Sequence, residues 1–197
     1  MSTADRTART GGRVRSQDAH DAVLSATAEL VEEIGYQRVT MEGVAQRANV
    51  AKSTIYRWWK SKPQLVMDAY RQTVEQRVPA PDTGDIRGDL VEFTTQLYRI
   101  DAYPVRAKAL RGLMAEAQLD SVFAQAFREW VDGRRAVVTQ LLTRAVERGE
   151  LTADIDADYA ADQLFGVFWY RLLTGRPLEP ERAAEHVDRL LRGIIRT

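Results

Sequence analysis

Side chains that donate hydrogen bonds gather in one short segment of the chain, between residues 52 and 58. Lys and Arg donate to phosphate oxygens or to guanine edges, and Ser and Thr hydroxyls contact either. A tyrosine phenol on a helix surface suits a phosphate oxygen. These residue types at this density indicate contact with a nucleic acid. The candidate contact residues are Lys52, Ser53, Thr54, Tyr56, Arg57 and Trp58.

The charge around this segment is uneven, although the chain as a whole is neutral, with 28 Lys+Arg against 28 Asp+Glu in 197 residues. Residues 38–62 carry six basic side chains and one acidic side chain. Residues 6–15 form a basic arm that includes Arg13 and Arg15, whereas residues 18–33 carry five acidic side chains and no Lys or Arg. Such clusters are common on solvated surfaces, but this arrangement also fits a nucleic-acid footprint.

Composition argues against several kinds of chemistry. The chain has no Cys and two His, which excludes a thiolate zinc site or a cysteine nucleophile and makes a His metal site unexpected. No glycine-rich phosphate loop or nucleophile elbow occurs, and His20 and His186 are expected on exposed helix faces. We therefore expect no enzyme activity, no metal and no cofactor. The N-terminus lacks the apolar core of a signal peptide and no apolar run spans a membrane, so a cytoplasmic location is expected.

Helical periodicity places the donor-rich segment in a small helical domain. Ser16 is a plausible N-cap for a first helix that ends at Gly35, and Thr40 caps a short helix that ends near Ala48. Asn49 breaks the pattern, because Asn tolerates the left-handed backbone region. A second short helix over residues 51–58 completes a helix-turn-helix, in which the second helix enters the major groove of DNA.

Further along the chain, Ser61 and Gln64 form a capping box that opens a connecting helix. The segment from Pro79 to Gly84 is the strongest break in the sequence. Five more helices are expected beyond it, and no sheet, so the predicted fold is all-α with about nine helices. The expected parts are a disordered arm at 1–15, a helix-turn-helix domain at 16–62, a connecting helix at 63–78 and a larger helical domain at 79–197.

A series of residues between positions 22 and 65 adds a family resemblance. In chain order, the series is Gly35-Tyr36, Thr40, Val44-Ala45, Ala48-Asn49-Val50, Thr54-Ile55-Tyr56, Trp59, Ser61-Lys62 and Leu65. This order and spacing resemble the DNA-binding domain of the TetR family of bacterial transcriptional regulators. Four positions depart from the family pattern: Asn49 replaces a Gly, Ala51 a capping Ser, Trp58 a His or Tyr, and Trp59 a Phe. Loss of the cap at Ala51 costs roughly 0.5–2 kcal/mol.

The resemblance implies phosphate contacts for Tyr56 and Lys62. It leaves Thr40 open between helix cap and phosphate contact, and Trp58 open between packing and DNA contact. For Ile55 and Trp59, burial in the core is the expected role. The expected DNA-binding set is completed by Arg13, Arg15 and Arg47.

The resemblance also implies that the C-terminal helices bind a small hydrophobic or aromatic effector and form a homodimer. Aromatic residues at helical spacing are more often part of a plain core than of a ligand pocket, and polar residues such as Arg106, Lys108, Arg111 and Glu116 can line a pocket or face solvent. The candidate pocket residues are Tyr98, Tyr103, Leu110, Met114, Phe123, Phe127, Trp130, Phe165, Phe168 and Trp169. The candidate dimer residues, which could instead close the monomer core, are Leu164, Leu172, Val187, Leu190, Leu191 and Ile194.

The resulting hypothesis is a homodimeric repressor that binds a palindromic operator on double-stranded DNA and is released by a small-molecule effector. A second recognition helix supplies specificity that one helix with few base contacts lacks. Two alternatives remain: a helical dimerisation or adaptor module, and a small helical hydrolase, each without DNA binding.

Overall fold

The computed structural model describes residues 4–194, with side chains described for residues 17–193, and in this part of the chain the protein consists of helices and the segments that connect them. Within that range it has nine α-helices and no strand, as expected from the sequence. The chain divides into an N-terminal unit, residues 1–73, and a C-terminal unit, residues 74–197. The division falls inside one helix, α4 (Lys62–Arg77). No helix in the described range is long and apolar enough to cross a membrane.

The first helix, α1 (Ala4–Ile34), is longer than expected. Residues 4–15 are helical, so the prediction of a disordered arm is wrong for them, and Ser16 is not the N-cap. The reason is that no proline interrupts these residues and that Ala and Arg are good helix formers. The side chains of Arg13 and Arg15 lie outside the described residues. The helix ends where predicted, since Gly35 takes a left-handed φ of 79°.

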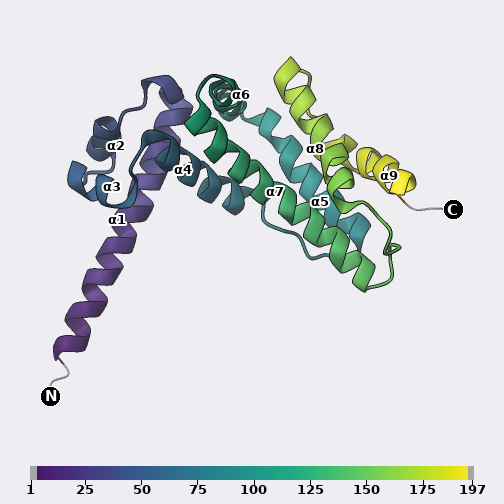
Figure 1. Ribbon diagram of the computed structural model, residues 1–197, viewed down its shortest axis with the longest axis horizontal. Helices are drawn as coiled ribbons and strands as arrows, with labels where there is room; N and C mark the ends of the chain where they lie inside the picture. Colours follow the sequence, from purple (N-terminus) through teal and green to yellow (C-terminus); the bar gives the residue numbers. More distant parts are fainter. Residues whose placement is uncertain (1–3, 195–197) are drawn as a thin grey trace. The chain divides into compact units, whose positions relative to one another are not determined.

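The helix-turn-helix consists of α2 (Met41–Arg47) and α3 (Lys52–Trp58), which pack beside α1 in the N-terminal unit (Figure 1). The hydroxyl oxygen of Thr40 accepts a hydrogen bond from the backbone N–H of Gly43 at 3.0 Å, so the predicted cap of α2 is confirmed. Asn49 has a φ of 53°, which confirms the expected left-handed turn. Ala51 precedes α3 without a side-chain cap, so packing must hold this short helix.

The start of α4 is held by contacts within the N-terminal unit. The hydroxyl of Ser61 accepts from the N–H of Gln64 at 3.4 Å, and the side chain of Gln64 accepts from the N–H of Lys60 at 3.2 Å. The predicted capping box is therefore present, but the donor of its second hydrogen bond is the N–H of Lys60, one residue before Ser61. The indole N–H of Trp59 donates to Asp68 at 2.9 Å, which ties the end of the helix-turn-helix to α4.

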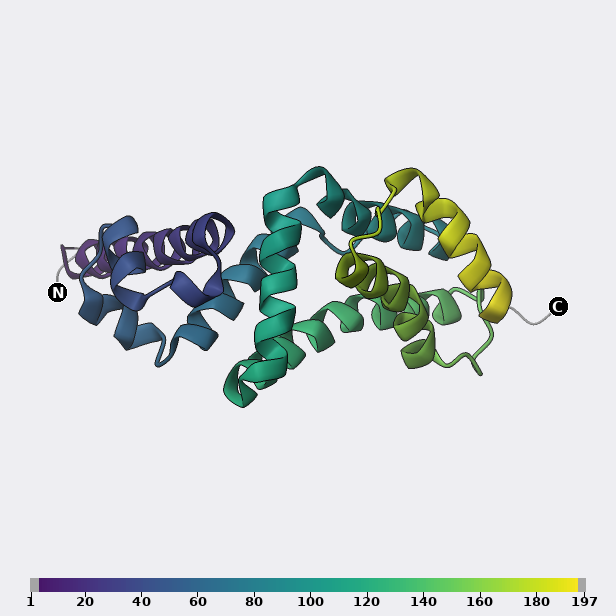
Figure 2. The same ribbon diagram turned by 90° about the horizontal axis from the view of Figure 1, so that it is seen from above.

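The C-terminal unit contains the remaining five helices. Helices α5 and α9 lie side by side, and α7 packs against both α6 and α8 (Figures 1 and 2). The end of α5 and the start of α9 differ from expectation. A short 3-10 turn follows α5, and another precedes α9. Three of the helices begin with an Asp whose carboxylate caps free N–H groups. The bounds are α5 Ile86–Tyr98, α6 Pro104–Leu119, α7 Ser121–Glu147, α8 Ala157–Thr174 and α9 Ala183–Ile194.

The segment that follows α4 is anchored by side chains of α5 and α7. Arg134 donates to the carbonyl of Val78 at 2.9 Å, and Arg144 donates to the carbonyl of Pro81 at 2.9 Å. Asp89 is fully buried and accepts from both the N–H and the hydroxyl of Thr83, at 2.6 and 2.8 Å. The predicted break at residues 79–84 is therefore a connection that side chains of α5 and α7 hold at Pro81 and Thr83.

Candidate nucleic-acid interface

The exposed face of α3 carries the donors that the sequence singled out. Lys52, Ser53, Tyr56 and Arg57 are exposed and lie on the same side of the helix, at positions one and four apart. Thr54 is half-buried. The opposite side is fixed by two apolar anchors, Ile55 and Trp59, which are 0% and 2% exposed. The burial of these anchors, which the sequence predicted, is what turns the donors outward.

Lys52 and Tyr56 are close to each other on this face. The ammonium of Lys52 lies 5.6 Å from the centre of the Tyr56 ring and pairs with the carboxylate of Glu42 on α2. The hydrogen bond to Glu42 raises the pKa of Lys52 above its ordinary value, so the lysine is charged at neutral pH. Both partners of this pair are exposed, and exposed ion pairs exchange readily for a stronger anion.

Lys62 and Thr40 flank this face at the first turns of α4 and α2. The ammonium of Lys62 donates to the carbonyl of Tyr36 at 3.2 Å and lies 4.1 Å from the centre of the Tyr36 ring. An ammonium has three N–H donors, so this anchored lysine keeps donors for an anion. Thr40 is exposed and already acts as a cap.

Arg47 has a different environment from the one expected. Its guanidinium makes a two-pronged contact with Glu33, at 2.8 and 2.9 Å, and a third contact with Glu29 at 3.3 Å. These carboxylates on α1 raise the pKa of Arg47 above its ordinary value. Arg47 therefore links α2 to α1 through ion pairs, and the two carboxylates of α1 balance its charge. Sequence reasoning missed this pairing, since the partners lie 14 and 18 residues earlier on another helix.

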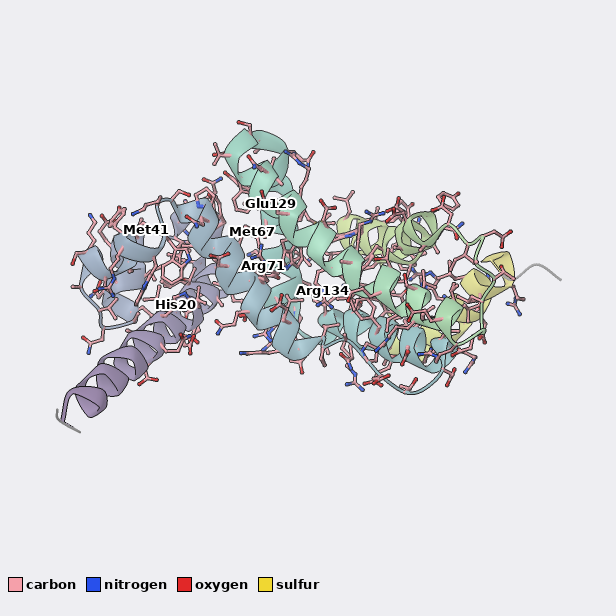
Figure 3. All side chains as sticks on the ribbon, turned by 60° about the horizontal axis from the view of Figure 1, so that its bottom comes forward. His20, Met41, Met67, Arg71, Glu129 and Arg134 are labelled. Carbon is pink, nitrogen blue, oxygen red and sulfur yellow. The ribbon has the colours of Figure 1, made fainter. Side chains whose placement is uncertain are left out.

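Trp58 belongs to an aromatic cluster that includes a histidine. The ring of His20 lies 4.7 Å from that of Trp59 and 5.2 Å, edge-on, from that of Trp58. The guanidinium of Arg57 lies 4.9 Å from the centre of the Trp58 ring. His20, which Figure 3 labels on α1, is half-buried, so the expectation of an exposed surface residue is wrong. Of the two roles left open for Trp58, these contacts favour packing.

Several of the aromatic residues predicted to line an effector pocket pack against one another. Phe127 lies 5.5 Å from Trp130 and 6.1 Å from Trp169, and Phe168 lies 5.0 Å from Trp169, measured between ring centres. Tyr103 is 48% exposed. A cavity of about 160 Å³ lies elsewhere in the C-terminal unit, where α5, α8 and α9 meet. Of the ten predicted residues, Tyr98 lines this cavity. Helical spacing of aromatic residues does not show whether they belong to a core or line a pocket.

The residues predicted to form a dimer interface are core residues of the chain itself. Those with described side chains are at most 7% exposed, which leaves them little surface for a second copy; they are Leu164, Leu172, Val187, Leu190 and Leu191. The side chain of Ile194 lies outside the described residues. Sequence reasoning missed a different row on α8, whose members are spaced by eight, three and three residues. Tyr159, Val167, Tyr170 and Leu173 are 61%, 37%, 54% and 65% exposed there, and we call them the α8 stripe.

Two family models match the chain. Residues 23–69 match the model described as bacterial regulatory proteins, tetR family, and residues 80–190 match the tetracyclin repressor-like C-terminal domain. The first match covers the helix-turn-helix and the start of α4, and the second covers the C-terminal unit except for its first and last few residues.

Similar proteins are regulators of the same type. The chain is 34% identical to the uncharacterized HTH-type transcriptional regulator YdeS of Bacillus subtilis, over 94% of each chain. It is 30% identical to the DNA-binding transcriptional repressor TetR of Mycobacteroides abscessus, over 92% of this chain and 96% of that one. The crystal structure of the TetR family regulator SCO0332 superposes with a TM-score of 0.78 at 33% identity, over 91% of this chain and all of that one. The chain therefore belongs to the TetR family of bacterial helix-turn-helix transcriptional regulators.

Proposed function

We propose that the protein is a homodimeric repressor in which each copy places α3 in the major groove of a palindromic operator. The observation that carries the proposal is the exposed face of α3, where Lys52, Ser53, Tyr56 and Arg57 are held outward by the buried Ile55 and Trp59. Side chains of this kind contact base edges and phosphates when a helix lies in the groove. The relative in Mycobacteroides abscessus is named a repressor, which supports this direction of regulation.

The proposed contacts divide into two groups. Lys62 and Tyr56 would bind phosphates, since the ammonium of Lys62 is anchored on Tyr36 beside the first turn of α4. Lys52, Ser53 and Arg57 would face the groove, where they reach base edges. Phosphate contacts fix the register of the helix and base contacts provide the sequence preference.

The α8 stripe supports the proposed homodimer. An exposed row of large apolar side chains on a helix is typical of a surface that another protein covers. In a twofold dimer the same stripe would pack against its copy. A dimer presents two α3 helices, so the proposed operator has two half-sites separated by one turn of DNA or a multiple of it.

The proposed release by a small molecule follows the family's usual regulation. FadR of Bacillus subtilis, a structural neighbour at 19% identity with a TM-score of 0.68, was solved in complex with stearoyl-CoA. In the protein described here the proposed effector would favour a state whose α3 helices are wrongly spaced for the operator, by binding that state more tightly.

Selection of binding sites from random DNA with the purified full-length protein tests the proposal. The expected result is enrichment of one inverted repeat, bound at physiological salt far more tightly than the unselected pool. Enrichment of a single, non-repeated site would contradict the twofold arrangement. Failure to enrich any sequence, with binding that vanishes at physiological salt, would contradict operator recognition altogether.

A further inference from the structure

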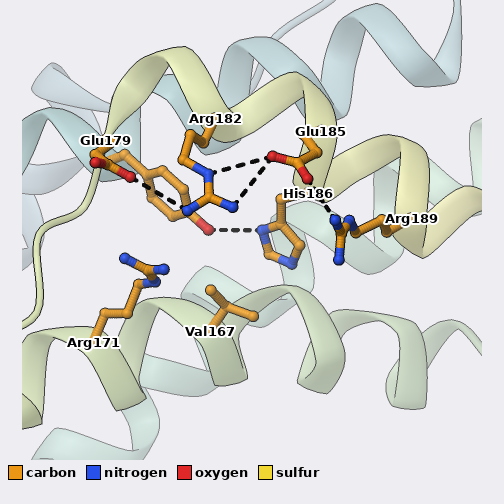
Figure 4. A pocket seen from close by; sticks show the side chains of 8 residues that line it. Val167, Arg171, Glu179, Arg182, Glu185, His186 and Arg189 are labelled. Atoms are coloured by element: carbon orange, nitrogen blue, oxygen red, sulfur yellow. Dashed lines mark hydrogen bonds and ion pairs between the residues drawn. The ribbon is translucent and has the colours of Figure 1, made fainter.

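The cavity between α5, α8 and α9 contains an unusual set of charged side chains (Figure 4). Arg182 pairs with Glu185 at 3.3 Å and with Glu179 at 3.5 Å, and Arg189 pairs with Glu185 at 2.5 Å. These four side chains balance one another in charge. The cavity wall therefore presents two arginines and two carboxylates that pair with one another, from the turn before α9 to the middle of that helix.

Arg171 on α8 is the remaining charge in the cavity wall. Its guanidinium donates to the carbonyl of Pro177 at 2.5 Å, and it makes no ion pair with a carboxylate among the described side chains. In Figure 4 it lies across the cavity from Arg182, without a contact to the carboxylates drawn there. A guanidinium has five N–H donors, so Arg171 keeps donors for a ligand. The cavity as a whole has an excess of one positive charge.

The remaining polar groups of the cavity are neutral. The hydroxyl of Tyr98 lies 2.7 Å from Nδ1 of His186. Burial raises the pKa of Tyr98 to about 12 and lowers the pKa of His186 below its ordinary value, so at neutral pH the tyrosine donates to an uncharged imidazole. This pair adds no charge to the cavity. Much of the rest of the cavity wall is apolar and includes the side chain of Val167 and the ring of Tyr98.

We propose that this cavity binds a small organic monocarboxylate, whose carboxylate pairs with Arg171 and whose apolar part lies against Val167 and Tyr98. One surplus positive charge matches one negative charge, whereas a phosphate dianion would meet the carboxylates of Glu179 and Glu185. Arginine and carboxylate form two parallel hydrogen bonds, which is the strongest pairing available to this site. The volume of about 160 Å³ is below the roughly 300–1,000 Å³ of drug-sized pockets, which favours a small ligand.

The site also has a regulatory consequence, which rests on the proposed function. Val167 belongs both to the cavity wall and to the α8 stripe. A ligand in the cavity would therefore touch the surface that a second copy covers. Occupancy would change the packing of the two copies and hence the spacing of their α3 helices.

Isothermal titration of the full-length protein with benzoate and with hexanoate, and with the matched amides benzamide and hexanamide, tests the site. The expected result is that at least one carboxylate binds, and about tenfold more tightly than its amide. The variant Arg171→Gln should weaken carboxylate binding about tenfold, while Arg192→Gln, which removes an exposed arginine of α9 outside the cavity, should leave it unchanged. The variant Val167→Trp should abolish binding by filling the cavity.

Equal affinity for acid and amide would overturn the proposal, and so would the absence of binding to the wild-type protein, neither of which depends on a variant. Unchanged affinity in folded Arg171→Gln would also overturn it. The titration contains no DNA, so failure of the site is distinguishable from failure of the proposed function. If a carboxylate binds but does not change operator affinity, the ligand site stands and its regulatory consequence is wrong.

Discussion

The guanidinium of Arg134 donates to the carbonyl of Val78, the residue that follows α4, across 2.9 Å. Arg134 lies on α7 (Figure 3) and is 7% exposed, with its charge 5.2 Å from the centre of the Phe93 ring. Burial lowers its pKa from the ordinary value. A buried cation is costly unless its donors are bonded, so this contact fixes the C-terminal end of the helix that leads out of the DNA-binding domain.

Replacement of Arg134 by alanine should destabilise the protein by about 2 kcal/mol. The variant loses a hydrogen bond with a charged donor, leaves the carbonyl of Val78 without its partner and removes buried side-chain stem. Urea unfolding followed by circular dichroism measures the effect. Arg128→Ala, at an exposed position of the same helix, is the matched control and should change stability little. Equal stability of the two variants would show that the Arg134 contact does not hold this connection.

The pairing of Arg47 with Glu33 leads to a prediction about non-specific DNA binding. The substitution Glu33→Gln removes the carboxylate that holds the guanidinium and a negative charge near the basic segment. Affinity for DNA without an operator should rise, and the salt dependence of binding should steepen by up to about one phosphate contact. Fluorescence anisotropy with random-sequence duplex measures both. Glu147→Gln, in the C-terminal unit, is the control and should leave both values unchanged.

If Glu33→Gln leaves non-specific binding as it was, the acidic part of α1 does not limit contact with DNA. In that case Arg47 serves only to tie α1 to α2, and the variant should show a loss of thermal stability alone.

The α8 stripe predicts a change in oligomeric state. Leu173→Glu places a charge on the stripe and should convert the dimer to a monomer, because a charge without a partner is unfavourable in a covered interface. Leu119→Glu is a stringent control, since Leu119 is 81% exposed but lies at the end of α6, outside the stripe. Sedimentation velocity distinguishes the two states. A Leu173→Glu variant that remains dimeric would require a different interface.

His186 makes the stability of the protein depend on pH. Burial lowers its folded pKa below the ordinary value of 6.5, and the charge of Arg171 acts in the same direction. Below about pH 6.5 the unfolded chain therefore binds more protons than the folded one, and stability falls as the pH drops toward the folded pKa. Thermal unfolding at about pH 7.5 and about pH 5.5 should show a smaller drop in Tm for His186→Gln than for the wild type.

His20→Gln is the matched control for this prediction, because it removes the other histidine of the chain. It should retain the wild-type difference in Tm between the two pH values. An equal drop in His186→Gln and the wild type would mean that groups other than His186 cause the loss of stability in acid.

The sequence predicted the DNA-binding domain well, because its determinants are local. Thr40 as a cap, Asn49 in a left-handed turn, and Ile55 and Trp59 as anchors each follow from residue type and from neighbours within a few positions. The orientation of the α3 donors then follows from the helical repeat. The ion pairs of Arg47 with Glu33 and Glu29 were not predictable, because the partners lie on another helix and charge counting along the chain does not show which cation is paired.

The sequence predicted the helices of the C-terminal unit, but it did not predict which faces of these helices are buried and which are exposed. Tyr98 and His186 are 88 residues apart and meet only when α5 and α9 pack side by side. On α8, residues of similar hydrophobicity alternate between core and surface, so that Leu172 is buried and Leu173 is 65% exposed. Which side of such a helix faces its own chain depends on packing against its neighbours, which for α8 are α5, α6, α7 and α9, and the periodicity of one helix does not contain that information.

The exposed face of α3, together with the first turn of α4, is the surface that we propose binds the operator. Anisotropy titrations over a salt series, on the operator recovered by selection, test it with Lys62→Ala and Tyr56→Phe and with Lys108→Ala, an exposed lysine of the C-terminal unit, as control. The expected result is a loss of affinity of about tenfold for Lys62→Ala and a salt slope reduced by about one, with a smaller loss for Tyr56→Phe and none for the control. Wild-type affinity and salt slope in both variants, with the dimer intact, would show that this surface does not bind the operator.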